Sequence, residues 1–158
     1  MNEVEAWLIW LRAPNTGGAR LRRALMRFES LAEAYRAGAS AWRTIGLSDE
    51  AVQWLKLPDG SRIERDLRWL ESADNHLLTC DSPDFPSLLQ RIPGAPAALF
   101  VRGDPITLWQ PQVAIVGSRN ASPGGLALAR DFAATLSRAG FCITSGMADG
   151  VDGAAHTA

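Results

Sequence analysis

The stretch VAIVGSRNASPGG, Val113 to Gly125, decides the fold of the second half of the chain. Its apolar residues 113–116 are typical of a strand covered on both faces, and the small residues after them predict a tight turn. A helix is expected from Ser122 to Ala139, closed by Gly140, and a second apolar strand from Phe141 to Thr144. Strand, helix and strand in this order predict a βαβ unit with two parallel strands.

A second glycine-rich turn follows the second expected strand, in the stretch ITSGMADGVDGAAHTA at residues 143–158. In a parallel sheet the two turns emerge at the same edge and are expected to lie side by side. Phosphate oxygens can be bound by glycine amides, by the helix N-termini near Ser122 and Asp152, and by the forked guanidinium of Arg119. The alternative to phosphate binding is a purely structural role for these glycines, because any doubly wound fold needs small residues at such turns. The candidate phosphate-binding residues are Gly117, Ser118, Arg119, Ser145, Gly146, Met147 and Ala148.

Ser145, Asp152 and His156 have the residue types of a hydrolase triad. However, Asp152 and His156 are four residues apart at an expected helix start, where Asp caps the helix and His can bond to it. The serine also lacks a G-x-S-x-G turn, and no second His or Cys has metal-ligand spacing with His156. The sequence therefore predicts a binding site with no catalytic residue, no metal and no cofactor.

The first 73 residues show helical periodicity with small capping residues between the segments. Ser30 with Glu33 and Ser61 with Glu64 match capping-box spacing, and Ser48 marks another helix start. Five of the six tryptophans fall in this part beside Leu and Ile. They are interpreted as the core of a small helical bundle rather than as a stacking surface.

A Pro-Asn-Thr-Gly-Gly turn separates two helical segments in APNTGGARLRRALMRF, residues 13–28. Asn and Gly accept a left-handed backbone, so the amides of this turn suit an anion-binding nest. The following helix has arginines on the face opposite its leucines. Two interpretations stay open: a hairpin that contacts a DNA backbone, and a solvated amphipathic helix after an ordinary turn. The candidate auxiliary DNA contacts are Gly17, Gly18, Arg20, Arg23 and Arg27.

A segment rich in Pro and Gly begins at His76 and contains strand-like pieces at Leu77–Cys80 and Ala98–Val101. It places a domain boundary near residue 75. The predicted fold class is α/β, with an all-helical N-terminal domain at residues 1–75. A linker and the first part of a Rossmann-like parallel sheet follow at residues 76–158.

Composition and net charge restrict the classes of protein to which the chain can belong. The chain has 158 residues, 47% of them hydrophobic, and a net charge of −1, which predicts a globular protein without a general cationic field. Any nucleic-acid binding therefore has to come from a local patch. There is no apolar run of membrane-spanning length, so no membrane partner is expected and the cytoplasm is the expected location. Cys80 and Cys142 are expected to be reduced structural thiols.

These motifs together resemble the DNA-processing protein A (DprA/Smf) family. The resemblance is carried by IVGSR, by the following SPGG and by SGMADGVDGAAH, which begins at Ser145. The helical first half is similar to that family's helix-hairpin-helix or sterile-alpha-motif-like domain. The segment LLTCDSPDFPSLLQRIPGAPAALFVRGD, residues 77–104, resembles its connecting segment. The resemblance thus spans nearly the whole chain.

The resemblance implies a non-enzymatic protein of natural transformation and recombination, which binds and protects incoming single-stranded DNA and helps to load the RecA recombinase. It implies that Arg119 contacts a DNA phosphate, and that the other turn residues line the pocket. It also implies further strands beyond Ala158 and a homodimer when the protein is intact. Asp149 departs from the pattern, because it places an acid in the second turn.

An alternative is a Rossmann-type nucleotide-binding enzyme of the lysine-decarboxylase-like or phosphoribohydrolase type. Its Pro-Gly-Gly-x-Gly-Thr turn and following catalytic Glu are not found in these residues. A third possibility is that the helical domain is chiefly a protein-interaction module.

A doubly wound sheet has about five or six strands, so the sheet that starts at Val113 is expected to be incomplete. Residues 1–158 alone are therefore expected to self-associate through the sheet region and to bind single-stranded DNA much more weakly than the intact protein, whereas residues 1–75 stay monomeric and folded.

Overall fold

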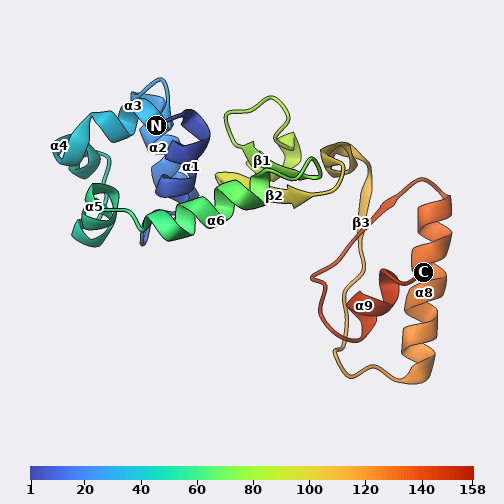
Figure 1. Ribbon diagram of the computed structural model, residues 1–158. Coiled ribbons are helices and arrows are strands. Elements are labelled where there is room, and N and C mark those ends of the chain that lie inside the picture. Colours follow the sequence, from blue (N-terminus) through green and yellow to red (C-terminus); the bar gives the residue numbers. More distant parts are fainter. The chain divides into compact units, whose positions relative to one another are not determined.

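The structure, a computed structural model, describes residues 1–158, and the chain divides into two compact units, Met1–Pro105 and Ile106–Ala158. Helices dominate the first unit, and the second contains a small parallel sheet (Figure 1). The predicted mixed α/β class is therefore confirmed. No helix has both the length and the apolar character needed to span a bilayer.

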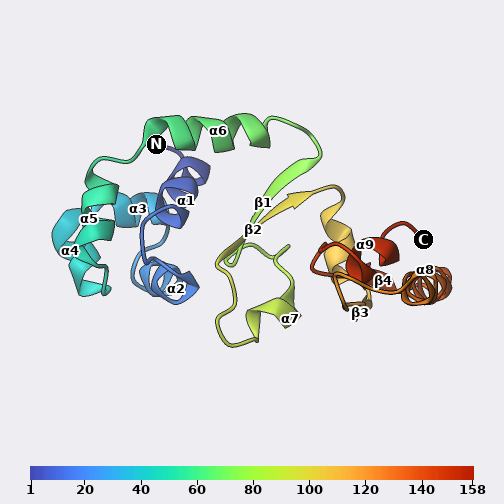
Figure 2. The ribbon, with the colours of Figure 1, turned by 90° about the horizontal axis from the view of Figure 1, so that it is seen from below.

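The first unit begins with six helices, in agreement with the helical periodicity of the sequence. It then adds a hairpin of two strands with a short helix in the connection between them (Figure 2). The helices are α1 (Glu3–Leu11), α2 (Gly18–Arg27), α3 (Leu31–Arg36), α4 (Gly38–Thr44), α5 (Asp49–Lys56), α6 (Gly60–Leu70) and α7 (Ser87–Gln90), and the strands are β1 (Asn75–Thr79) and β2 (Ala98–Arg102). The helix-hairpin-helix character of the turn between α1 and α2 stays a prediction.

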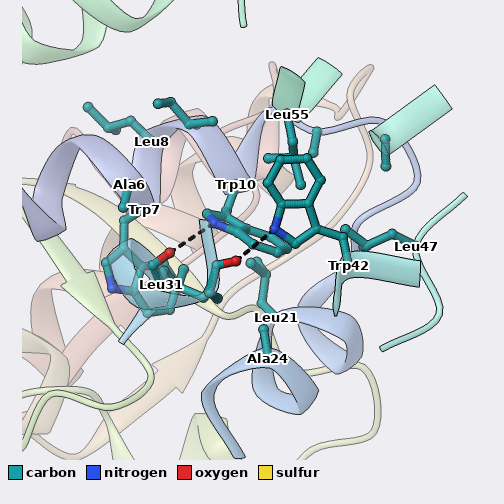
Figure 3. Close-up of a cluster of buried hydrophobic side chains, with 14 of the residues drawn as sticks. Ala6, Trp7, Leu8, Trp10, Leu21, Ala24, Leu31, Trp42, Leu47 and Leu55 are labelled. Carbon is teal, nitrogen blue, oxygen red and sulfur yellow. Dashed lines mark hydrogen bonds between the residues drawn. The ribbon is translucent and has the colours of Figure 1, made fainter. Parts of the chain in front are cut away.

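Tryptophan side chains occupy the core of the first unit, as predicted (Figure 3). The Trp10 and Trp42 rings meet edge to face, with their centroids 6.4 Å apart, and both side chains are buried. Each indole N–H finds a backbone acceptor: Trp10 donates to the carbonyl of Leu31 at 3.2 Å and Trp42 to that of Ala34 at 2.7 Å. The buried indoles therefore carry no unsatisfied donor.

Two of the three helix starts predicted in the first unit are confirmed. The Ser30 hydroxyl accepts the amide of Glu33 at 3.1 Å, and the Ser48 hydroxyl accepts the amide of Ala51 at 3.2 Å. The start predicted at Ser61 is wrong, because α6 already begins at Gly60 and its N-cap is Asp59. The Asp59 carboxylate accepts the Ser61 amide at 3.1 Å and also the Ser61 hydroxyl, which lowers the pKa of Asp59.

Strands β1 and β2 confirm the two strand-like pieces of the Pro- and Gly-rich segment. They pair antiparallel with each other, from Asn75↔Arg102 to Thr79↔Ala98, and form a sheet of their own. The Trp69 ring of α6 meets the Phe100 ring of β2 at a centroid distance of 5.7 Å. The hairpin thus belongs to the same compact unit as the helices, while the domain boundary near residue 75 stays a prediction.

The second unit contains β3 (Gln112–Ala114), α8 (Pro123–Arg138), β4 (Cys142–Thr144) and α9 (Val151–Ala155), after a 3-10 helix at Pro105–Trp109. Strands β3 and β4 pair parallel, from Gln112↔Cys142 to Ala114↔Thr144, which confirms the βαβ unit. Gly140 closes α8 with a left-handed backbone, φ 90°. Helices α8 and α9 lie next to each other and are in contact (Figure 1).

Both strands of this unit are shorter than predicted and are only partly buried. The ladder ends at the bond from the Ile115 amide to the Thr144 carbonyl, 2.9 Å, so the chain leaves the sheet before Val116. The sequence predicts that both faces of these strands are buried, but within residues 1–158 every residue of β3 and β4 is exposed or only partly buried. An apolar groove instead opens between β3 and α8, where Leu128 and Phe132 are each 57% exposed.

Candidate nucleic-acid interface

The two glycine-rich turns lie side by side at the carboxyl ends of β3 and β4, and one carboxylate joins them. Asp152 accepts the Gly117 amide on Oδ1 at 3.1 Å and the Gly146 amide on Oδ2 at 2.9 Å. Its side chain is only 4% exposed. The predicted juxtaposition of the turns is confirmed, but Asp152 does more than start a helix. We call this pair of hydrogen bonds the Asp152 clasp.

Close packing also holds the second turn against the first. Gly150 has φ 85°, and a Cβ there would collide with the carbonyl oxygens of Ser118 and Arg119. The Val151 amide donates to the Ser118 carbonyl at 3.1 Å. A Cβ on Gly117 would come within 2.9 Å of the Val151 side chain. Gly117 and Gly150 are therefore required for contact between the turns themselves.

Each turn is also folded by a serine hydroxyl that accepts an amide two residues later. The Ser118 hydroxyl accepts the Asn120 amide at 3.1 Å, and the Ser145 hydroxyl accepts the Met147 amide at 3.0 Å. Met147 adopts a left-handed backbone, φ 54°, which is uncommon outside glycine, and its side chain is 70% exposed. The second turn thus displays an apolar side chain beside the sheet edge.

Ser145 and His156 are in contact, with Ser145 Oγ 2.8 Å from His156 Nε2. The bond expected between Asp152 and His156 is not formed, because both Asp152 oxygens accept turn amides. The histidine therefore lacks the carboxylate that orients it in a hydrolase triad. The arrangement does not assemble a triad from these three residues. No group of three or more His, Cys, Asp or Glu side chains is placed to hold a metal ion.

Positive charge at this edge comes from Arg119 and from the start of α8. Arg119 is exposed in the first turn, and its guanidinium has no acidic partner in the structure. Helix α8 has 16 residues and no acid in its first turn, and its N-cap Ser122 accepts the Gly125 amide at 3.2 Å. A helix of this length presents partial positive charge at its N-terminus. Helix α9, with five residues, is too short to add a comparable site.

The remaining predicted site residues lie on the same two turns. Ser118 and Gly146 are exposed, Ala148 is partly buried, and the Ser118 and Arg119 amides have no hydrogen-bond partner. Asp149 is exposed in the second turn, whereas Asp152, three residues later in α9, is buried. Sequence reasoning missed the Asp152 clasp. The only signal in the sequence was a second acid close to Asp149, at the helix start that follows a turn expected to bind phosphate.

The residues of the α2 region lie in the first unit and make contacts within it. Arg20 donates to the carbonyls of Gly46 at 2.9 Å and Asn15 at 2.7 Å, and Arg23 donates to that of Ile45 at 3.3 Å. Gly18 packs so closely that a Cβ would lie 2.5 Å from the Ala95 carbonyl oxygen, whereas Gly17 and Arg27 are exposed. Their predicted auxiliary role in DNA binding stays a prediction.

The second unit therefore has the strand-turn-helix-strand-turn order of a Rossmann-like fold, with two joined turns at one sheet edge. Residues 76–158 match the family described as DNA recombination-mediator protein A, and the chain belongs to this family.

Individual relatives agree with this assignment. Protein Smf of Escherichia coli is 43% identical over 109 residues, which cover 69% of this chain and 29% of that protein. Protein Smf of Synechocystis is 30% identical over 164 residues, covering 99% of this chain and 41% of that protein. The X-ray structure of DNA processing protein A from Streptococcus pneumoniae matches with a TM-score of 0.71 at 23% identity, covering 99% of this chain and 54% of that one. The chain thus spans less than half the length of these two Smf proteins.

Proposed function

We propose that this chain binds single-stranded DNA at the carboxyl ends of β3 and β4, as part of a recombination mediator without catalytic turnover. One observation carries the proposal. Arg119 is an exposed, unpaired arginine on a turn that the Asp152 clasp holds in place. An arginine fork beside a helix N-terminus and unused backbone amides is suited to a phosphate oxygen.

The preference for a single strand follows from Met147. Its exposed side chain lies on the second turn, beside the turn that carries Arg119, so the edge offers an apolar contact next to a cationic one. In a single strand the bases are splayed out and can meet an apolar side chain while the backbone meets the charge. In a duplex the bases are stacked inside, and only the phosphates remain available at such an edge.

Family membership supports the wider part of the proposal. The family is described as DNA recombination-mediator protein A, which is consistent with a protein that acts on DNA during recombination. We propose that the protein acts in the cytoplasm in natural transformation, protects the incoming strand, forms a homodimer and presents the strand to RecA. In this proposal residues 76–158 contain the start of the DNA-binding domain, and the helical residues 1–75 have an auxiliary role.

The test is a fluorescence anisotropy titration of a labelled oligo-dT and of a duplex of equal length, repeated over a series of salt concentrations. We expect tighter binding of the single strand and an affinity that falls as salt increases, because cations are released from the phosphates. Equal or tighter binding of the duplex, or no binding of either, would contradict the proposal. Addition of RecA to the preformed complex then reports transfer of the strand.

A further inference from the structure

The Asp152 carboxylate is the one acidic side chain of the second unit that is buried, and no ion pair with a cation accounts for it. Burying a carboxylate is costly unless hydrogen bonds satisfy it. Here the two bonds come from backbone amides of two turns that are 29 residues apart in the chain, since Gly117 and Gly146 both donate to it. The carboxylate occupies the place where the two glycine turns meet.

This geometry changes what the glycines of the site contribute. A bound phosphate needs free N–H donors. The amides of Gly117 and Gly146 are already used by Asp152, and that of Met147 is used by the Ser145 hydroxyl. The donors that remain at the first turn are the Ser118 and Arg119 amides and the Arg119 guanidinium.

We infer that Asp152 is a positioning residue, whose clasp fixes the first turn so that Arg119 and its neighbouring amides face the ligand. In this assignment Gly117 and Gly146 serve the clasp, and the phosphate is bound by Ser118 and Arg119. The inference rests on the proposed function for the identity of the ligand. The clasp itself does not, because both of its hydrogen bonds are made within the chain.

The first measurement tests the Asp152 clasp without DNA. It compares the rates of amide hydrogen exchange, followed by NMR, in the parent chain and in Asp152→Asn. Asn has one acceptor oxygen, and its NH2 group faces the second amide as a donor. We expect exchange to become at least about tenfold faster at one of the Gly117 and Gly146 amides, and at both in Asp152→Ala. The Ile115 amide, bonded to Thr144, is the internal control and should stay protected.

The second measurement is the affinity for labelled oligo-dT. Asp152→Asn should weaken binding by roughly tenfold, because Arg119 is no longer held in one place. Asp149→Asn is the matched control: it removes the same charge only three residues away, but Asp149 is exposed. That variant should bind as well as the parent chain or better, because a repulsive charge near the DNA is lost.

A global loss of fold in Asp152→Asn would show as lost protection at Ile115. In that case Gly146→Ala replaces it, since a Cβ there would lie 3.2 Å from the Asp152 Oδ2 atom and disturb only the clasp. Gly124→Ala, where a Cβ meets nothing within 4 Å, is its control. We expect Gly146→Ala to speed exchange at the Gly117 amide and to weaken DNA binding, and Gly124→Ala to do neither.

The outcomes separate the two proposals. If the parent chain binds no DNA, the proposed function fails, and the clasp is judged from hydrogen exchange alone. If the parent chain binds DNA and Asp152→Asn, with Ile115 still protected, binds as tightly, the positioning role is overturned. Unchanged exchange at Gly117 and Gly146 in Asp152→Ala would overturn the clasp itself.

Discussion

The carbonyl oxygen of Ser118 occupies the space that a Cβ on Gly150 would need. Gly150 also has φ 85°, a backbone conformation that side chains rarely adopt. We predict that Gly150→Ala separates the two turns and destabilises the second unit, with backbone strain alone costing about 1–3 kcal/mol. Thermal unfolding followed by NMR measures this. Gly124→Ala is the control and should leave the second unit intact; equal stability of the two variants would contradict the packing described here.

Arg119→Ala is predicted to weaken binding of single-stranded DNA without unfolding the chain. An exposed arginine with no protein partner adds little to stability, while the loss of one charge-assisted phosphate contact costs roughly tenfold or more in affinity. The slope of log affinity against log salt should fall by about 0.7. Arg138→Ala, at the other end of α8, is the matched control. An unchanged affinity and slope in folded Arg119→Ala would remove this residue from the site.

The arginines of α2 are predicted to matter less for DNA than Arg119. Arg20 and Arg23 donate to carbonyls of the first unit, so the triple replacement of Arg20, Arg23 and Arg27 by Ala should lower the melting temperature of that unit. Arg27→Ala alone should leave the melting temperature nearly unchanged, because the side chain is exposed. If the folded triple variant loses more affinity for oligo-dT than Arg119→Ala, the main binding site lies on α2.

The apolar groove between β3 and α8 is predicted to drive self-association of residues 1–158. Leu128 and Phe132 expose apolar surface that water disfavours, and exposed patches of this kind promote contact between copies. Phe132→Glu should therefore lower the apparent mass at high concentration in light scattering. Asp131→Glu, on the neighbouring exposed position of the same helix, is the control. A parent chain that stays monomeric would contradict this prediction.

The βαβ unit was predictable because its signals are local. Apolar runs, the cap at Ser122 and the left-handed Gly140 each follow from a few neighbouring residues. Strand length was less predictable. Strand β3 ends where its pairing with β4 ends, and the apolar side chain of Val116 does not indicate where the pairing stops. The helix start at Asp59 was missed because Ser61 offered an equally good spacing pattern.

The site was predictable in its position but not in its chemistry. Parallel strands bring their turns to one edge by topology alone, so the meeting of the two glycine turns followed from the sequence. Which groups remain available to a ligand depends on contacts across the turns. Asp149 and Asp152 have the same side chain, and only the fold makes one exposed and the other a buried acceptor for Gly117 and Gly146.

The central claim is that single-stranded DNA binds at the carboxyl ends of β3 and β4, and chemical-shift mapping tests it most directly. Unlabelled oligo-dT is added to the 15N-labelled chain, and every amide signal is followed. We predict that the shifts concentrate on Ser118, Arg119 and residues 145–148, and that Arg119→Ala makes them smaller at the same concentration of oligo-dT. Shifts concentrated on α2 or the β1–β2 hairpin, with these turns unmoved, would contradict the account.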